Sequence, residues 1–253
     1  MTIEFVICGL EHSGTTLISD LFRQVDGLDA GFEAGVLLSE KPSEFQTLEP
    51  FATIIKEGWN IDEAAFTRCC AAPTHAAFYK QLKIESAELL GDNIRIFDKT
   101  PRYLSRLDDC LTRTDAPFIA SFKDPRAIVH SDFRRVDNDD FFGWYKDYMP
   151  KKRHYLRTCY RQYKNAKANE PRVFFISLEM LALDARNSMD AMFGHVGLEF
   201  SLNYMLMNGL RYANTRSNAV SIPIAFSYLA DFDDQHTNLI EKDFAELEDW
   251  FYQ

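Results

Sequence analysis

Apolar residues gather in four short runs along the chain, and each run is followed directly by glycine or a polar residue. The runs are rich in β-branched and aromatic side chains, which is typical of strands that are buried on both faces of a sheet. They predict strands over residues 3–8, 94–97, 117–122 and 172–176.

The segments between these strands have the spacing of helices. Residues 15–25 place apolar side chains on one helical face, at Leu17, Ile18, Leu21, Phe22 and Val25. Three more helical stretches are predicted: a mostly helical region over 36–90 with loops at its prolines, a long basic helix over 145–167, and an acidic, exposed helix over 237–252.

Strands that are separated by helical stretches favour a three-layer α/β fold, with a parallel sheet flanked by helices. The length of 253 residues suits a single domain over 1–253, with 36–90 as its helical region. Ligands of such folds bind at the carboxyl ends of the strands. The polar clusters of this chain come directly after its predicted strands, so they are the candidate site.

The first of these clusters, Cys8 to Thr16, joins a strand to a helix. Its backbone N–H groups and the helix dipole form a cradle for an anion. Gly9 and Gly14 have the spacing of the phosphate loop of nucleoside triphosphatases, but Thr15 stands where that loop has lysine. The loop therefore favours a smaller anion than a triphosphate, and an ordinary glycine-rich turn is the alternative.

Four segments resemble sulfotransferases that use 3′-phosphoadenosine 5′-phosphosulfate (PAPS), of the bacterial and carbohydrate-type branches. Residues 13–16 (Ser-Gly-Thr-Thr) are similar to the 5′-phosphosulfate loop of that family, and residues 123–131 are similar to its 3′-phosphate motif. Residues 98–101 and 176–181 are similar to two supporting stretches. The resemblance implies a P-loop-like fold, PAPS as co-substrate and no metal.

The resemblance also implies site residues. The loop residues Glu11, His12, Ser13, Gly14, Thr15 and Thr16 are expected to hold the 5′-phosphosulfate. Lys123 and Ser131 are expected to hold the 3′-phosphate, with Arg126, Arg211 and Arg216 as further contacts. The family usually has arginine where this chain has Lys123, and a point charge there replaces a bidentate fork.

The main departure from the family is His12, which stands where the family has lysine or arginine. A free imidazole is mostly uncharged at neutral pH, but nearby anions raise its pKa. We expect His12 and Lys99 together to neutralise the charge that develops on the leaving phosphate, and Asp98 is a candidate to orient Lys99.

A carboxylate is the expected base that takes the proton of the acceptor. In the family a glutamate about twenty residues after the basic position of the loop does this, and Glu33 lies 21 positions after His12. Glu33 is the predicted base, Glu40 is the competitor, and a helix cap is the alternative role for Glu33.

The formal net charge of −10 argues against general binding of nucleic acid. The five scattered cysteines are odd in number and lack the spacing of a zinc site, which indicates reduced thiols in a cytoplasmic protein. No apolar run is long enough to span a membrane, and no basic leader precedes the first strand. A basic face of the helix over 145–167 is either solvated or attracts an anionic acceptor; it comprises Lys151, Lys152, Arg153, Arg157 and Arg161.

The predicted function is transfer of a sulfuryl group from PAPS to a hydroxyl or amine of a carbohydrate or small-molecule acceptor. A kinase-like phosphotransferase is one alternative, disfavoured because Thr15 replaces the lysine of the phosphate loop. A nucleotide-binding homologue that has lost catalysis is the other, kept open by His12.

Overall fold

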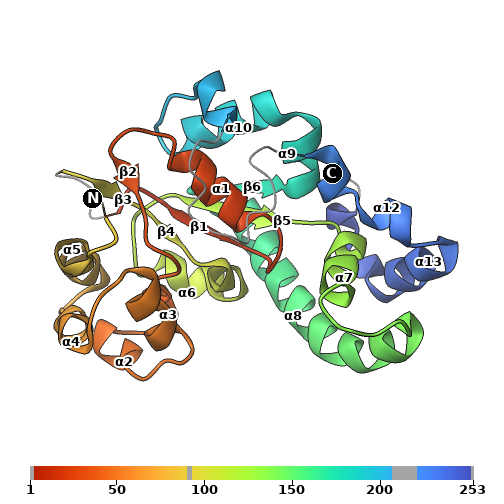
Figure 1. Cartoon of the computed structure of the whole chain (residues 1–253), viewed down its shortest axis with the longest axis horizontal. Coiled ribbons are helices and arrows are strands. Elements are labelled where there is room, and N and C mark those ends of the chain that lie inside the picture. The colour runs from red at the N-terminus through yellow and green to blue at the C-terminus, as the bar shows by residue number, and fades with distance from the viewer. Residues whose placement is uncertain (1–2, 90–92, 207–220, 252–253) are drawn as a thin grey trace.

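The computed structural model describes residues 3–89, 93–206 and 221–251, and its centre is a four-stranded parallel sheet (Figure 1). The strand order is β4-β1-β5-β6. The strands are β1 (Val6–Gly9), β4 (Asp98–Lys99), β5 (Phe118–Phe122) and β6 (Val173–Ser177). All residues of β1 and β5 are buried, as expected for central strands that are covered on both faces.

The predicted strand over 94–97 is divided between two sheets. Its first part forms β3 (Arg95–Ile96), which pairs with the short strand β2 (Leu28–Asp29). The polar residues after Phe97 form β4, which pairs with β1. The predicted strand ended at Phe97 because the residues of β4, Asp98 and Lys99, are charged. They are nevertheless buried, since each has a partner inside the protein.

Helices cover both faces of the sheet, which confirms the predicted α/β class (Figure 1). On one face lie α1 (Thr15–Phe22), α9 (Leu178–Leu183) and α10 (Ala185–His195). On the other lie α6 (Leu107–Leu111) and α8 (Phe141–Asn169). Short 3₁₀ segments are η2 (Pro101–Arg106) before α6 and η3 (Leu202–Met205) after α10.

The region over 36–90 is helical in the part that the structure describes. It contains η1 (Val36–Leu38), α2 (Pro42–Phe45), α3 (Phe51–Gly58), α4 (Glu63–Cys70) and α5 (His75–Glu85). Phe45 packs edge-on against Phe66 and Phe78, so aromatic contacts join α2, α4 and α5 into one subassembly beside the sheet.

The C-terminal segment differs in part from the predicted exposed helix over 237–252. It consists of α13 (Asp234–Asp243) and η4 (Ala245–Trp250). Only Ile240 of α13 is buried, whereas Phe244, Trp250 and Phe251 after it are buried, so the exposed helix is shorter than predicted. The carboxylates of the segment bind part of the predicted basic face of α8: Arg153 contacts Asp243, and Arg157 contacts Glu246. This face is therefore partly covered by the chain itself.

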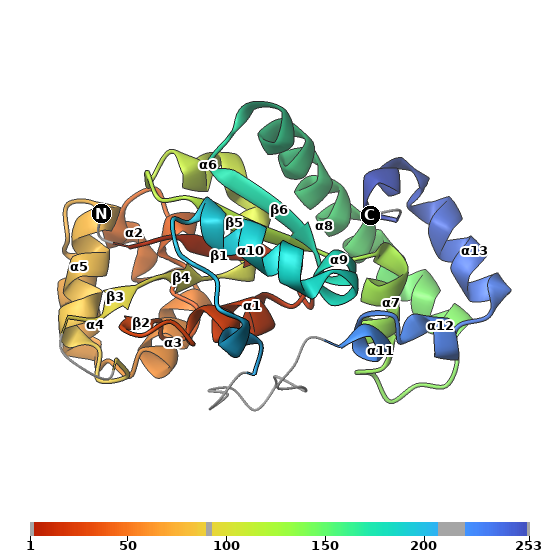
Figure 2. The same ribbon diagram turned by 90° about the horizontal axis from the view of Figure 1, so that it is seen from above.

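The remaining helices gather beside α13 at one end of the molecule (Figure 2). They are α7 (Pro125–Phe133), α11 (Ile222–Ala225) and α12 (Tyr228–Asp231). All five cysteines are buried and free. Among the described residues, none of the helices combines the length and apolar character needed to cross a membrane.

Candidate functional site

The loop between β1 and α1 is attached to the end of β5. Because β1 and β5 are parallel neighbours, Gly9 lies opposite Ser121. The Ser13 hydroxyl donates to the Ser121 carbonyl over 3.1 Å, and the Ser121 hydroxyl donates to the Ser13 carbonyl over 2.5 Å. Since Lys123 follows β5 directly, the two segments predicted to hold opposite ends of one nucleotide meet at one edge of the sheet.

Two glycines give this loop its shape. A Cβ on Gly9 would lie 2.4 Å from the Ser121 carbonyl oxygen. Gly14 has φ 86°, and a Cβ there would lie 2.7 Å from Leu178 Cδ1. No larger residue fits either position without a shift of the backbone or of Leu178.

The amides at the start of α1 are the ones predicted to form an anion cradle. No side chain caps this helix, and the amides of its first turn have no intrahelical acceptor. The Ser13 amide, which was predicted to join the cradle, donates to the Leu10 carbonyl over 3.2 Å. The predicted cradle is therefore narrowed to the amides of Gly14, Thr15 and Thr16, and Ser13 holds the loop in place.

Glu33 and Lys99, which were predicted as catalytic, form an ion pair. Lys99 Nζ lies 3.2 Å from Glu33 Oε1, and their side chains are 1% and 17% exposed. The ammonium group also lies 3.9 Å from the centre of the Phe32 ring. Burial raises the pKa of Glu33 and Lys99 opposes that rise; burial lowers the pKa of Lys99 and Glu33 opposes that fall. The competitor Glu40 is exposed.

Asp98 holds the segment that follows Glu33. Its buried carboxylate accepts four hydrogen bonds, from the Tyr79 hydroxyl (2.5 Å), the Tyr103 hydroxyl (2.7 Å), the Thr100 hydroxyl (2.9 Å) and the Ala34 amide (3.4 Å). Because side chains alternate along the chain at β4, Lys99 points to Glu33. Its neighbours Asp98 and Thr100 accept hydrogen bonds from the backbone amides that follow Glu33. Asp98 thus positions Glu33 through the backbone, a role that the sequence did not indicate.

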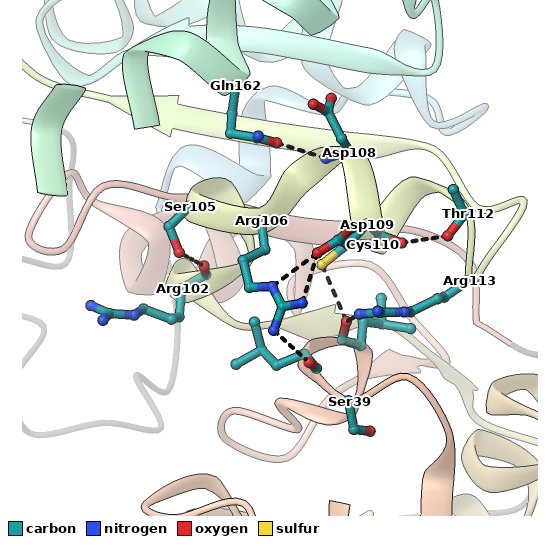
Figure 3. Close-up of polar contacts among 12 residues, drawn as sticks. Ser39, Arg102, Ser105, Arg106, Asp108, Asp109, Cys110, Thr112, Arg113 and Gln162 are labelled. Atoms are coloured by element: carbon teal, nitrogen blue, oxygen red, sulfur yellow. Dashed lines mark hydrogen bonds and ion pairs between the residues drawn. The ribbon is translucent and has the colours of Figure 1, made fainter. Parts of the chain in front are cut away.

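The backbone segment that follows Glu33 is also held at Leu37 and Leu38 (Figure 3). Arg106 Nη1 donates to the Leu38 carbonyl over 3.1 Å, and Arg113 Nη1 donates to the Leu37 carbonyl over 2.5 Å. The Cys110 thiol lies 3.4 Å from the same Leu37 oxygen. Glu33 therefore lies on a backbone segment that is held at several points, as a precisely placed base requires.

Of the predicted 3′-phosphate residues, Lys123 lies just before α7, and Ser131 lies in its last turn. Lys123 is buried, and Ser131 accepts a hydrogen bond from Arg135 Nη1 over 2.6 Å. Burial lowers the pKa of Lys123, Glu179 opposes that shift, and Arg135 adds to it. Arg135 was not among the residues predicted from the sequence, although its position four residues after Ser131 is the spacing at which helical side chains meet.

Arg126 has a structural role that argues against its predicted nucleotide contact. Its guanidinium binds Asp124 and Glu241, each over 2.5 Å, and thereby ties α7 to α13. Glu11 binds Arg102 through its carboxylate over 3.1 Å. The predicted contacts Arg211 and Arg216 lie outside the described residues.

Glu179, in the first turn of α9, is buried and acts electrostatically on Lys123. Its carboxylate accepts a hydrogen bond from the Asp124 amide over 3.1 Å, and burial raises its pKa to about 7. Below this pKa the carboxyl is neutral, and above it a negative charge is buried near Lys123.

The change Glu179→Gln is expected to stabilise the protein at pH 8 by up to about 3 kcal/mol, and by less at pH 5. The folded-state pKa is raised, so the native chain loses stability as the pH rises from the unfolded pKa through about 7. Glutamine keeps an acceptor for the Asp124 amide without the charge. Urea denaturation at both pH values measures this, and an equal difference at both would contradict it.

His12 lies beside α7 and α8. Its Nε2 atom is 3.5 Å from Asp132 Oδ1, and its φ of 67° is in the left-handed region. Burial lowers its pKa, Arg135 adds to the fall, and Asp132 opposes it. No group of three or more metal-ligating side chains occurs within residues 3–89, 93–206 and 221–251.

The chain is similar in sequence and in fold to known sulfotransferases. The model of a family described as "Sulfotransferase family" matches residues 4–201. Similar solved structures are the sulfotransferase domain of the Synechococcus PCC 7002 olefin synthase (TM-score 0.66, 17% identity, 96% of this chain and 94% of that chain) and the sulfotransferase domain from the curacin biosynthetic pathway (0.62, 12%, 95% and 97%). A mouse sulfotransferase solved with PAP is also similar (0.58, 10%, 98% and 84%). No curated protein sequence matches the chain significantly.

Proposed function

This chain belongs to the sulfotransferase family, and we propose that it transfers the sulfuryl group of PAPS to a hydroxyl or amine of a carbohydrate or small-molecule acceptor. The meeting of the β1–α1 loop with the Lys123–Ser131 segment at one edge of the sheet carries this proposal. The complex of the mouse sulfotransferase with PAP supports the choice of donor.

In the proposed complex the Thr15 and Thr16 amides hold the 5′-phosphosulfate. Lys123, Ser131 and Arg135 hold the 3′-phosphate. The family usually has arginine at the position of Lys123, and in this chain the guanidinium of Arg135, which donates to the Ser131 hydroxyl, takes its place.

The proposed reaction is an in-line displacement. Glu33 takes the proton of the acceptor as the new oxygen–sulfur or nitrogen–sulfur bond forms and the bond between sulfur and the bridging phosphate oxygen breaks. Lys99 and His12 stabilise the charge on the transferring group and on the leaving phosphate. The product nucleotide is 3′-phosphoadenosine 5′-phosphate (PAP).

Thermal denaturation with added nucleotides tests the donor. PAP is expected to raise the melting temperature in proportion to its occupancy, and ATP with magnesium is expected to have little effect. The reverse result would favour the kinase-like alternative. PAP binding without sulfuryl transfer to any of a panel of sugars, phenols and amines would favour a nucleotide-binding homologue, the reading that His12 in place of lysine supports.

Arg135→Ala is expected to weaken PAP binding by about tenfold, because a charged hydrogen bond to the phosphate is lost. Arg135 is exposed, so the variant should fold normally. Arg134→Ala is the matched control, since Arg134 is also exposed and contacts Asp231. Isothermal titration with PAP measures both variants, and equal losses would contradict the role of Arg135.

A further inference from the structure

Asp132 connects the β1–α1 loop to helix α8. One of its oxygens, Oδ1, lies 3.5 Å from His12 Nε2. The other, Oδ2, lies 2.7 Å from Lys152 Nζ and accepts a hydrogen bond from the Tyr148 hydroxyl over 2.5 Å. A single carboxylate thus contacts the unusual residue of the loop on one side and a lysine on the other.

Lys152 differs from the other members of the basic face of α8. Its side chain is 9% exposed, whereas its neighbour Lys151 is an exposed residue. Its ammonium group lies 5.4 Å from the centre of the Tyr155 ring, and the Tyr155 hydroxyl accepts a hydrogen bond from the Glu11 amide over 3.2 Å. Helix α8 therefore contacts Glu11 directly and is linked to His12 through Asp132.

The position of the Asp132 carboxylate is unexpected, because a negative charge there lies beside the loop that is proposed to bind an anion. With a side chain that is 14% exposed, it is poorly screened by water. Alone it would repel a sulfated nucleotide. With Lys152 bound to it, the pair is neutral overall, and the carboxylate still holds the imidazole of His12.

We propose that Asp132 and Lys152 form a positioning pair for His12, in which Asp132 orients the imidazole toward the bound nucleotide and Lys152 cancels the charge of Asp132. This inference rests on the proposed function, since His12 is taken to face the leaving phosphate of PAPS. It explains how histidine serves at a position where the family has lysine or arginine: the orienting carboxylate comes from α7, and its counter-charge comes from α8.

The test compares Lys152→Met, Asp132→Asn and the double variant by PAP titration and by the rate of sulfuryl transfer. Lys152→Met is expected to weaken PAP binding by about tenfold or more, because it leaves an unpaired carboxylate beside the anion. The double variant is expected to recover most of the lost affinity. Asp132→Asn is expected to bind PAP normally but to have a lower kcat, because the carboxylate that orients the ring of His12 and opposes the fall of its pKa is lost.

Two controls separate this role from a structural one. Lys151→Met, a neighbouring exposed lysine on α8, should change neither affinity nor kcat, and Lys152→Arg should keep most of both. Urea denaturation checks that each variant is folded, and Lys152→Gln replaces Lys152→Met in the comparison if the latter is not.

The double variant decides the outcome. If it binds PAP as weakly as Lys152→Met, Lys152 acts on the nucleotide itself and the positioning pair is wrong. If Lys152→Met binds PAP like the native chain, the pair has no role in binding and the inference also fails. If the native chain does not bind PAP, the proposed function is the part that fails.

Discussion

Glu33→Gln is expected to lower the rate of sulfuryl transfer by about 10²–10⁴-fold at neutral pH while PAP still binds. The amide cannot take a proton from the acceptor, but its oxygen can still accept the hydrogen bond from Lys99, so the local structure should persist. Asp98 holds the backbone beyond Glu33 in either case. Steady-state kinetics with saturating PAPS and titration with PAP measure the two effects separately.

Glu40→Gln is the matched control for this variant. Glu40 lies seven residues further along the chain and is exposed, so its replacement should leave kcat within experimental error. A large loss of rate in Glu40→Gln together with an active Glu33→Gln would show that the base had been assigned to the wrong carboxylate.

Lys99→Met is expected to lower kcat by about 10²–10³-fold at neutral pH through the loss of one cation from the reacting centre. It should also change the pH profile. Burial raises the pKa of Glu33, and Lys99 is the main group that opposes this rise. Without the lysine, the carboxyl stays protonated to a higher pH and cannot act as a base there.

In Lys99→Met the acidic limb of the pH–rate profile therefore moves to higher pH, and part of the lost activity returns as the pH increases. Lys99→Arg is the control, because it keeps the cation and should leave the limb close to its native position. A Lys99→Met profile that is lower at every pH but unchanged in shape would mean that Lys99 does not tune Glu33.

Sequence reasoning identified the parts of the site that depend on local order. The glycines of the β1–α1 loop were predicted to be important from their spacing, and in the structure a Cβ atom at either Gly9 or Gly14 would clash with a neighbouring residue. Glu33 and Lys99 were predicted separately, and they prove to be in contact. Roles in binding and catalysis remain predictions for all of these residues.

Several features could not be predicted because they depend on which distant segments meet. The acidic C-terminal segment looked exposed, yet its carboxylates bind Arg153 and Arg157 on α8. Arg126 looked like a candidate for the nucleotide until its guanidinium was found between Asp124 and Glu241. In each case a charged residue found a partner far away in the sequence, which no local pattern reports.

The amino-acid sequence by itself determined the strand–loop–helix order, the α/β class and the position of the glycine-containing β1–α1 loop. These follow from the periodicity of apolar side chains and from the backbone freedom of glycine, which act over a few neighbouring residues. Only the tertiary structure decided which charges are paired, as Lys152 with Asp132 shows. Charge pairing depends on burial and on distances between side chains from separate elements, and both are set when the helices pack on the sheet.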